Sequence, residues 1–167
     1  IQIGGNLYNN SNYGSNTSSY VRFLNGTQRC NVTFFGNNSA VVTNNPAIST
    51  TPRTVFGGVT VNKGTTPDST LTWNIGGTLL TPADNWLTLQ NGTLNYNRSG
   101  DLTVSTTTDF IIPATAGLTL NTPSNVYISN NPASETVFLN GRLWILAGGG
   151  NVYIGPASNT ANNADIE

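Results

Sequence analysis

Short apolar segments recur along this chain, and five of them share a triplet in which threonine stands between two apolar residues. The last four triplets follow one another at nearly equal spacing, which we call the triplet interval. A repeat this short is too small for a domain but fits one coil of a solenoid, which buries its apolar face by stacking on its neighbours. The triplets are Val59-Thr60-Val61, Leu71-Thr72-Trp73, Leu87-Thr88-Leu89, Leu102-Thr103-Val104 and Leu118-Thr119-Leu120.

The alternation within each triplet predicts a strand whose first and third residues point inward while the middle threonine points outward. No apolar run keeps a helical period over two turns, so we expect no helix. The predicted fold is all-β, a parallel β-solenoid or β-helix of short coils, with a β-sandwich as the alternative. With one triplet per coil, two inner columns are expected: Leu71, Leu87, Leu102 and Leu118, and beside them Trp73, Leu89, Val104 and Leu120.

The chain divides by composition near residue 50. Residues 1–50 are rich in Asn and Ser with short strands, which predicts a cap or irregular first coils. Residues 51–167 carry the steadier pattern and are expected to be repetitive solenoid coils that continue beyond this segment. The chain begins at Ile1 and contains no methionine, so we expect a processed chain or an excised fragment.

Composition limits the possible functions. Charged residues make up 8% of the chain, against about 25% in average globular proteins, and the net charge is −1. This balance gives no electrostatic case for nucleic acid, and the short apolar runs predict no membrane span. The chain has no histidine, which excludes Ser-His-Asp and Cys-His catalysis and imidazole metal sites. We therefore expect a protein that is not an enzyme and needs no cofactor.

Two carboxylates suggest calcium as the one possible cofactor. Asp68 and Asp84 each stand shortly before the leucine of a triplet, and one triplet interval separates them. If that interval is one coil, the two lie about 4.8 Å apart and can share a calcium ion. The alternative, which the sequence favours, is that each aspartate caps the backbone of its own turn. A weaker cluster of Asp84, Asp101 and Arg98 is the only candidate for polysaccharide-lyase chemistry.

Aromatic residues at central, outward positions predict a binding surface. Tyr127, Trp144 and Tyr153 each occupy such a position and are the candidate ligand-binding residues, with glycans as the expected partner. The alternative is that they are scattered surface aromatics, which are common on β-folds.

The amino-acid pattern of several segments resembles that of a known group of proteins. It is visible in Phe56-Gly57-Gly58-Val59-Thr60-Val61-Asn62-Lys63-Gly64, in residues 87–94, in residues 115–121, and in residues 137–145 and 148–155. From about Val21 onward the chain resembles the β-solenoid regions of large secreted and cell-surface proteins of Bacteroidota. The resemblance implies export by the type nine secretion system and a right-handed solenoid that continues past Glu167.

Together these observations predict an extracellular, non-catalytic structural or adhesive segment of a large bacterial surface or secreted protein. Its expected partners are glycans or neighbouring cell-surface components. Two alternatives remain open: a carbohydrate-binding or lyase-like solenoid, and a secretion cargo held by its export translocon.

Overall fold

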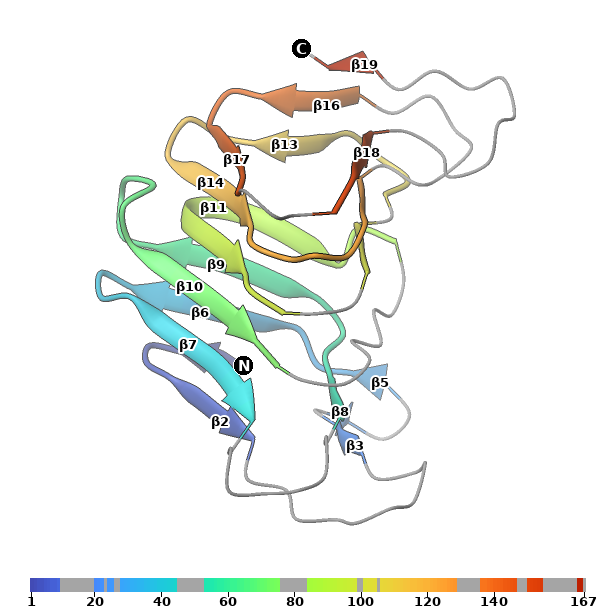
Figure 1. Ribbon diagram of the computed structural model, residues 1–167. Helices are drawn as coiled ribbons and strands as arrows, with labels where there is room; N and C mark the ends of the chain where they lie inside the picture. Colours follow the sequence, from blue (N-terminus) through green and yellow to red (C-terminus); the bar gives the residue numbers. More distant parts are fainter. Residues whose placement is uncertain are drawn as a thin grey trace.

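The computed structural model is a parallel β-solenoid, and its described part contains strands but no helix. It describes residues 1–9, 20–22, 24–25, 28–44, 53–75, 84–98, 101–104, 106–128, 136–146, 150–154 and 165–166. Figure 1 shows the strands stacked like rungs, from the N-terminal β2 to the C-terminal β19. The predicted fold class is therefore confirmed.

The largest sheet has nine strands, and β11 joins its two ladders. One ladder runs β1–β6–β9–β11 and the other β2–β7–β10–β11–β14–β17, all parallel. The bounds are β1 Gln2–Ile3, β2 Leu7–Asn9, β6 Val32–Gly36, β7 Ala40–Asn44, β9 Val59–Lys63, β10 Thr70–Asn74, β11 Leu87–Tyr96, β14 Ala116–Leu120 and β17 Arg142–Ile145.

Smaller sheets complete the coils. Two three-stranded parallel sheets run β12–β15–β18 and β13–β16–β19, β3 pairs with β8 in parallel, and among the described strands the β4–β5 pair alone is antiparallel. The bounds are β3 Tyr20–Arg22, β4 Leu24–Asn25, β5 Gln28–Arg29, β8 Arg53–Val55, β12 Leu102–Val104, β13 Phe110–Ile112, β15 Val126–Ile128, β16 Thr136–Leu139, β18 Val152–Ile154 and β19 Asp165–Ile166.

The coil is longer than the triplet interval. Leu71 pairs with Leu94, Leu94 with Leu118, and Leu118 with Leu143, so each coil is half as long again as that interval. Leu87 pairs instead with Val59. The prediction that one triplet interval is one coil is therefore wrong.

The predicted inner columns are wrong for the same reason. Leu71 and Leu118 lie in one ladder, two coils apart, whereas Leu87 and Leu102 lie on other sides of the solenoid. The observed column is Ala40, Leu71, Leu94, Leu118 and Leu143, with Val42, Trp73, Tyr96, Leu120 and Ile145 beside it. The triplet thus marks successive sides of a coil and not successive coils.

The inward direction of the triplet side chains is confirmed. The first and third residues of all five triplets are buried, because a pleated strand sends alternate side chains to opposite faces. Strands from both sides of the expected division at residue 50 pair within each of the two large ladders, since β6 pairs with β9 in one and β7 with β10 in the other.

Side-chain ladders of asparagine reinforce the stack and account for part of the high Asn content. Asn91 donates a hydrogen bond to Asn62 at 2.7 Å, and Asn121 donates to Asn97 at 2.8 Å. Each bond joins side chains that lie in consecutive coils. The sequence interpretation did not identify this stacking, which satisfies polar groups where few hydrophobic side chains are available.

The corner between the two large ladders holds a buried lysine. Lys63 is 0% exposed, and its Nζ donates to the carbonyl oxygen of Phe35 at 2.7 Å and to that of Gly4 at 3.4 Å. Burial lowers the pKa of this ammonium from its usual 10.5, because the charged form loses water. Lys63 therefore ties together backbone from three coils and is not exposed to solvent.

Candidate functional site

The three predicted ligand-binding aromatics point outward but do not form one surface. Trp144 is 53% exposed on β17, whereas Tyr127 and Tyr153 lie on β15 and β18 in a different sheet. The two tyrosine rings stack on each other with centroids 5.0 Å apart and an interplanar angle of 10°. Because each ring already covers one face of the other, the pair suits a stabilising ladder better than a ligand platform.

Asparagines hold the tyrosine pair in place. Asn125 Nδ2 lies 3.4 Å from the Tyr127 hydroxyl, and Asn151 Nδ2 lies 3.2 Å from that of Tyr153. Asn6 donates to Tyr8 in the same way, also at 3.2 Å. The recurrent Asn-x-Tyr at these three strand starts is the sequence signal for this arrangement, and it was not recognised.

Trp144 lines a groove on the face formed by β10, β11, β14 and β17, with a cavity volume of about 360 Å³. The strands that build this face stand at the front of Figure 1. Register places Thr72, Asn95, Thr119 and Trp144 in one outward column, and Thr70, Thr93, Gly117 and Arg142 in the next. The groove is lined by Pro67, Asp68, Thr70, Thr93, Asn95, Thr119, Arg142, Trp144 and Leu146.

An ion pair borders this groove. Arg142 Nη1 donates to Asp68 Oδ1 at 3.3 Å, and the Arg142 guanidinium carbon lies 5.6 Å from the centre of the Trp144 ring. Thr66 Oγ1 donates to the second carboxylate oxygen of Asp68 at 3.0 Å. The side chains of Arg142 and Asp68 are 45% and 74% exposed, so the pair adds little stability but places both charges beside an aromatic ring.

Asp68 and Asp84 are not brought together as neighbours one coil apart. Asp68 precedes β10, which pairs with the second half of β11, whereas Asp84 precedes the first half of β11, which pairs with β9. The spacing that suggested a shared calcium ion is therefore not a coil. Across the described ranges no three His, Cys, Asp or Glu side chains cluster as metal ligands.

The residues considered for lyase chemistry lie partly together at the end of β11. Arg98 and Asp101 both act electrostatically on Tyr96, which is 1% exposed. Burial raises the pKa of Tyr96 against the opposing charge of Arg98, and with a smaller contribution from Asp101 the pKa reaches about 12. A phenol that holds its proton this firmly is poorly suited to act as a general base near neutral pH.

The raised pKa of Tyr96 predicts a loss of stability at high pH. The unfolded chain releases this proton near pH 10.0 and the folded chain at about 12, so the stabilisation is complete below pH 10 and lost as pH rises to 12. We expect Tyr96→Phe to remove about 2–3 kcal/mol of this pH dependence. Urea titrations at a series of pH values measure it, and a wild-type slope unchanged by the substitution would contradict the assignment.

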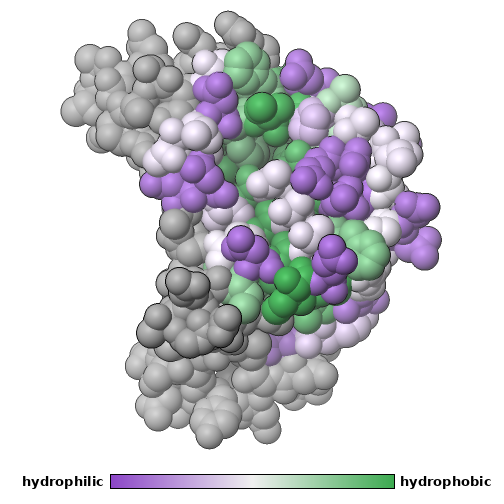
Figure 2. Space-filling model, turned by 180° about the vertical axis from the view of Figure 1, so that it is seen from behind, coloured by the Kyte–Doolittle hydropathy of each residue, from purple (hydrophilic) through white to green (hydrophobic). Residues whose placement is uncertain are grey.

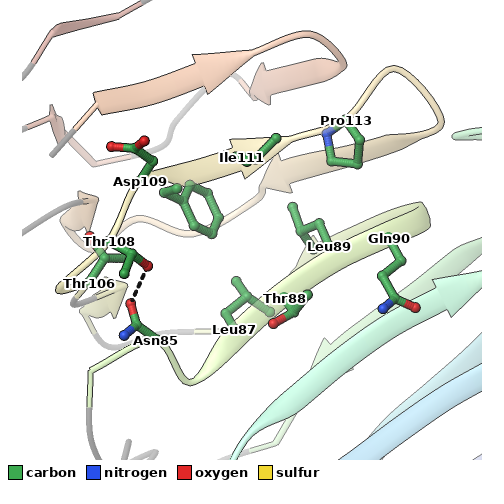
Figure 3. Close-up of a pocket in the computed structure, with 11 residues that line it drawn as sticks. Asn85, Leu87, Thr88, Leu89, Gln90, Thr106, Thr108, Asp109, Ile111 and Pro113 are labelled. Atoms are coloured by element: carbon green, nitrogen blue, oxygen red, sulfur yellow. Dashed lines mark hydrogen bonds between the residues drawn. The ribbon is translucent and has the colours of Figure 1, made fainter.

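A second groove lies where one side of the solenoid is interrupted. The first half of β11 pairs with β9, and β13 pairs with β16, but within the described strands no ladder joins β11 to β13. The groove between them has a volume of about 460 Å³. Figure 3 shows Leu87 and Leu89 from β11 below Ile111 and Pro113 of the β13 segment.

Polar contacts close both ends of this second groove. Asn85 donates to Thr107 Oγ1 at 2.7 Å and accepts from the Thr108 hydroxyl at 3.2 Å. At the other end, Thr115 Oγ1 donates to the carbonyl oxygen of Gln90 at 2.9 Å. Asn85 adopts a positive φ of 61°, which asparagine tolerates better than most residues. The gap between β11 and β13 is therefore held by hydrogen bonds at both ends and lined by apolar side chains.

The back of the molecule presents both hydrophilic and hydrophobic side chains (Figure 2). Figure 2 views the molecule from behind, and hydrophilic side chains cover much of the described surface there, with hydrophobic ones visible between them. Within the described residues no helix has the length and hydrophobicity needed to cross a bilayer. Comparison of the chain with family models, curated proteins and solved structures finds no match.

Proposed function

We propose that this chain is a non-catalytic structural and adhesive segment of a large extracellular protein, with glycans as its partners. The observation that carries this proposal is the face of β7, β10, β11, β14 and β17. Its strands stack in register, and it presents threonine and asparagine side chains and the Arg142–Asp68 ion pair around an exposed tryptophan. A ladder of this kind orders its surface side chains before a ligand arrives, which lowers the entropic cost of binding.

The low charge supports a glycan partner over a charged polymer. Charged residues make up only 8% of the chain, and its net charge is −1. Neutral polysaccharides offer hydroxyl groups and apolar ring faces, which hydroxyl, amide and aromatic side chains can match without ionic attraction. The proposed extracellular location and type nine export rest on the family resemblance described above.

An adhesion assay tests the proposal. Beads carrying the folded chain are placed under flow over surfaces coated with neutral polysaccharides, with acidic polysaccharides or with albumin. We expect retention on at least one polysaccharide, and retention should fall to the albumin level for beads carrying heat-unfolded chain. Equal retention of folded and unfolded chain on every surface would contradict adhesion by an ordered face.

A localisation experiment tests the extracellular part separately. An antibody against the folded chain should label intact cells of the producing organism, and labelling should disappear when type nine export is disabled. Labelling only after the cells are permeabilised would contradict a surface location.

A further inference from the structure

We propose that the groove beside Trp144 is a binding subsite for an uncharged hexose unit of a polysaccharide. The proposal rests on the adhesive function above and assigns it to one place on one face. The two residues that define the site, Trp144 and Arg142, lie on the same side of β17, and Asp68 reaches them from the turn before β10.

The first argument is the exposure of Trp144 compared with the other tryptophans. Trp73 and Trp86 are 2% and 5% exposed, and the Trp86 indole nitrogen donates to the Thr103 carbonyl oxygen at 2.9 Å. Trp144 is 53% exposed on β17, the last described strand of its ladder, where the neighbouring Ile145 is 54% exposed as well. A sugar ring has an apolar face of C–H groups that can cover such an indole.

The second argument is the polar lining of the groove. The Asn95 Oδ1 atom is buried and has no hydrogen-bond partner within the described part of the chain. An unsatisfied buried acceptor costs about 1–3 kcal/mol, and a hydroxyl group that entered the groove would satisfy it after a small movement of the amide. Thr119 lies beside Asn95 in the same column and is also largely buried.

The third argument is the charge balance. Arg142 and Asp68 form an ion pair, so the groove carries one positive and one negative group and no net charge. Together they offer guanidinium donors and a carboxylate acceptor, which is the complement of neighbouring sugar hydroxyl groups. A uronic acid would be attracted by Arg142 but repelled by Asp68, so the site favours a neutral sugar.

The size of the groove agrees with this ligand. Its volume of about 360 Å³ lies at the lower end of the range for small-molecule sites. The groove is open to solvent along the face, which suits a unit within a polymer. The apolar groove between β11 and β13 has the larger volume, but its lining contains neither an exposed indole nor an ion pair.

Titration of the purified chain with soluble oligosaccharides tests the subsite. The probes are neutral gluco- and manno-oligosaccharides and a uronic acid oligosaccharide of matched length, and the readout is tryptophan fluorescence with iodide quenching. Because Trp73 and Trp86 are buried, protection from iodide reports on Trp144. We expect a neutral oligosaccharide to protect Trp144 and to bind the wild type at least about tenfold more tightly than Trp144→Ala, with Trp144→Phe in between.

Matched variants complete the test. Binding of the variants is followed by calorimetry, because Trp144→Ala removes the fluorescent reporter. Tyr153→Ala removes an aromatic residue that is 43% exposed on another sheet, and it should bind as the wild type does. Asp68→Asn leaves Arg142 unopposed and should shift preference toward the uronic acid oligosaccharide. Tighter wild-type binding of the uronic acid probe, equal loss of affinity in the two alanine variants, or no binding of any neutral probe would each overturn the subsite. If adhesion of the beads survives Trp144→Ala, the subsite is wrong while the adhesive function stands.

Discussion

Replacement of Gly92 by alanine is expected to cost about 2–5 kcal/mol of folding free energy. Gly92 lies within β11 where the strand turns from one ladder into the other, and its φ is +75°. A side chain in this conformation costs about 1–2 kcal/mol, and forced overpacking adds about 1–3 kcal/mol more. A Cβ atom at Gly92 would meet the backbone oxygens of Lys63 and Ser69, the latter at 2.6 Å.

The contacts that a Cβ atom at Gly92 would make with the Lys63 and Ser69 oxygens involve backbone of the preceding coil. Because backbone atoms are involved, rotation of a side chain cannot relieve them. The free energy of unfolding from urea titration measures the effect. Gly5→Ala is the matched control, because a Cβ atom there meets nothing within 4 Å, and its stability should stay within about 0.5 kcal/mol of the wild type. A Gly92→Ala protein as stable as Gly5→Ala would show that β11 does not turn this corner as described.

Replacement of Trp73 by alanine should cost about 3–5 kcal/mol, the usual range for a buried large aromatic. The Trp73 ring is 2% exposed and makes edge contacts with Phe34 and Phe56, at centroid distances of 6.3 and 5.5 Å. Phe34 and Phe56 also contact each other at 6.4 Å. The cluster therefore joins residues from consecutive coils, and a cavity there loosens the stack as well as one strand.

Urea titration of Trp73→Ala, with Trp144→Ala as its control, tests this cluster. The control removes the same side chain from an exposed position, and we expect its stability to change by less than about 1 kcal/mol. A larger loss for Trp144→Ala than for Trp73→Ala would contradict the assignment of inner and outer residues.

The inward and outward faces could be predicted from sequence because the strand pleat is a local property with a period of two residues. Leu71, Trp73 and Thr72 were placed correctly on that basis. The choice of stacking partner is not local, because it depends on how many sides each coil has. The nearly equal intervals from Leu71 to Leu87 and from Leu87 to Leu102 were interpreted as the length of one coil. Each interval instead separates two different sides of the solenoid.

The candidate site shows the same division between local and non-local information. Trp144 was predicted to face outward from its place in its own strand. Arg142 stands two residues earlier in the same strand, and that alternation could have indicated a shared face. Asp68 is 74 residues from Arg142, and only the stacking of β10, β11, β14 and β17 brings the two together.

The most direct test of the coil is a pair of engineered disulfides. In a background that lacks the free Cys30, Thr72→Cys/Asn95→Cys joins ladder partners, whereas Thr72→Cys/Thr88→Cys joins residues separated by one triplet interval. Neighbouring parallel strands lie about 4.8 Å apart, within the Cα separation that a disulfide spans. Mass spectrometry after mild oxidation should find the first disulfide formed and the second pair still as free thiols. Formation of the second disulfide without the first would contradict the account.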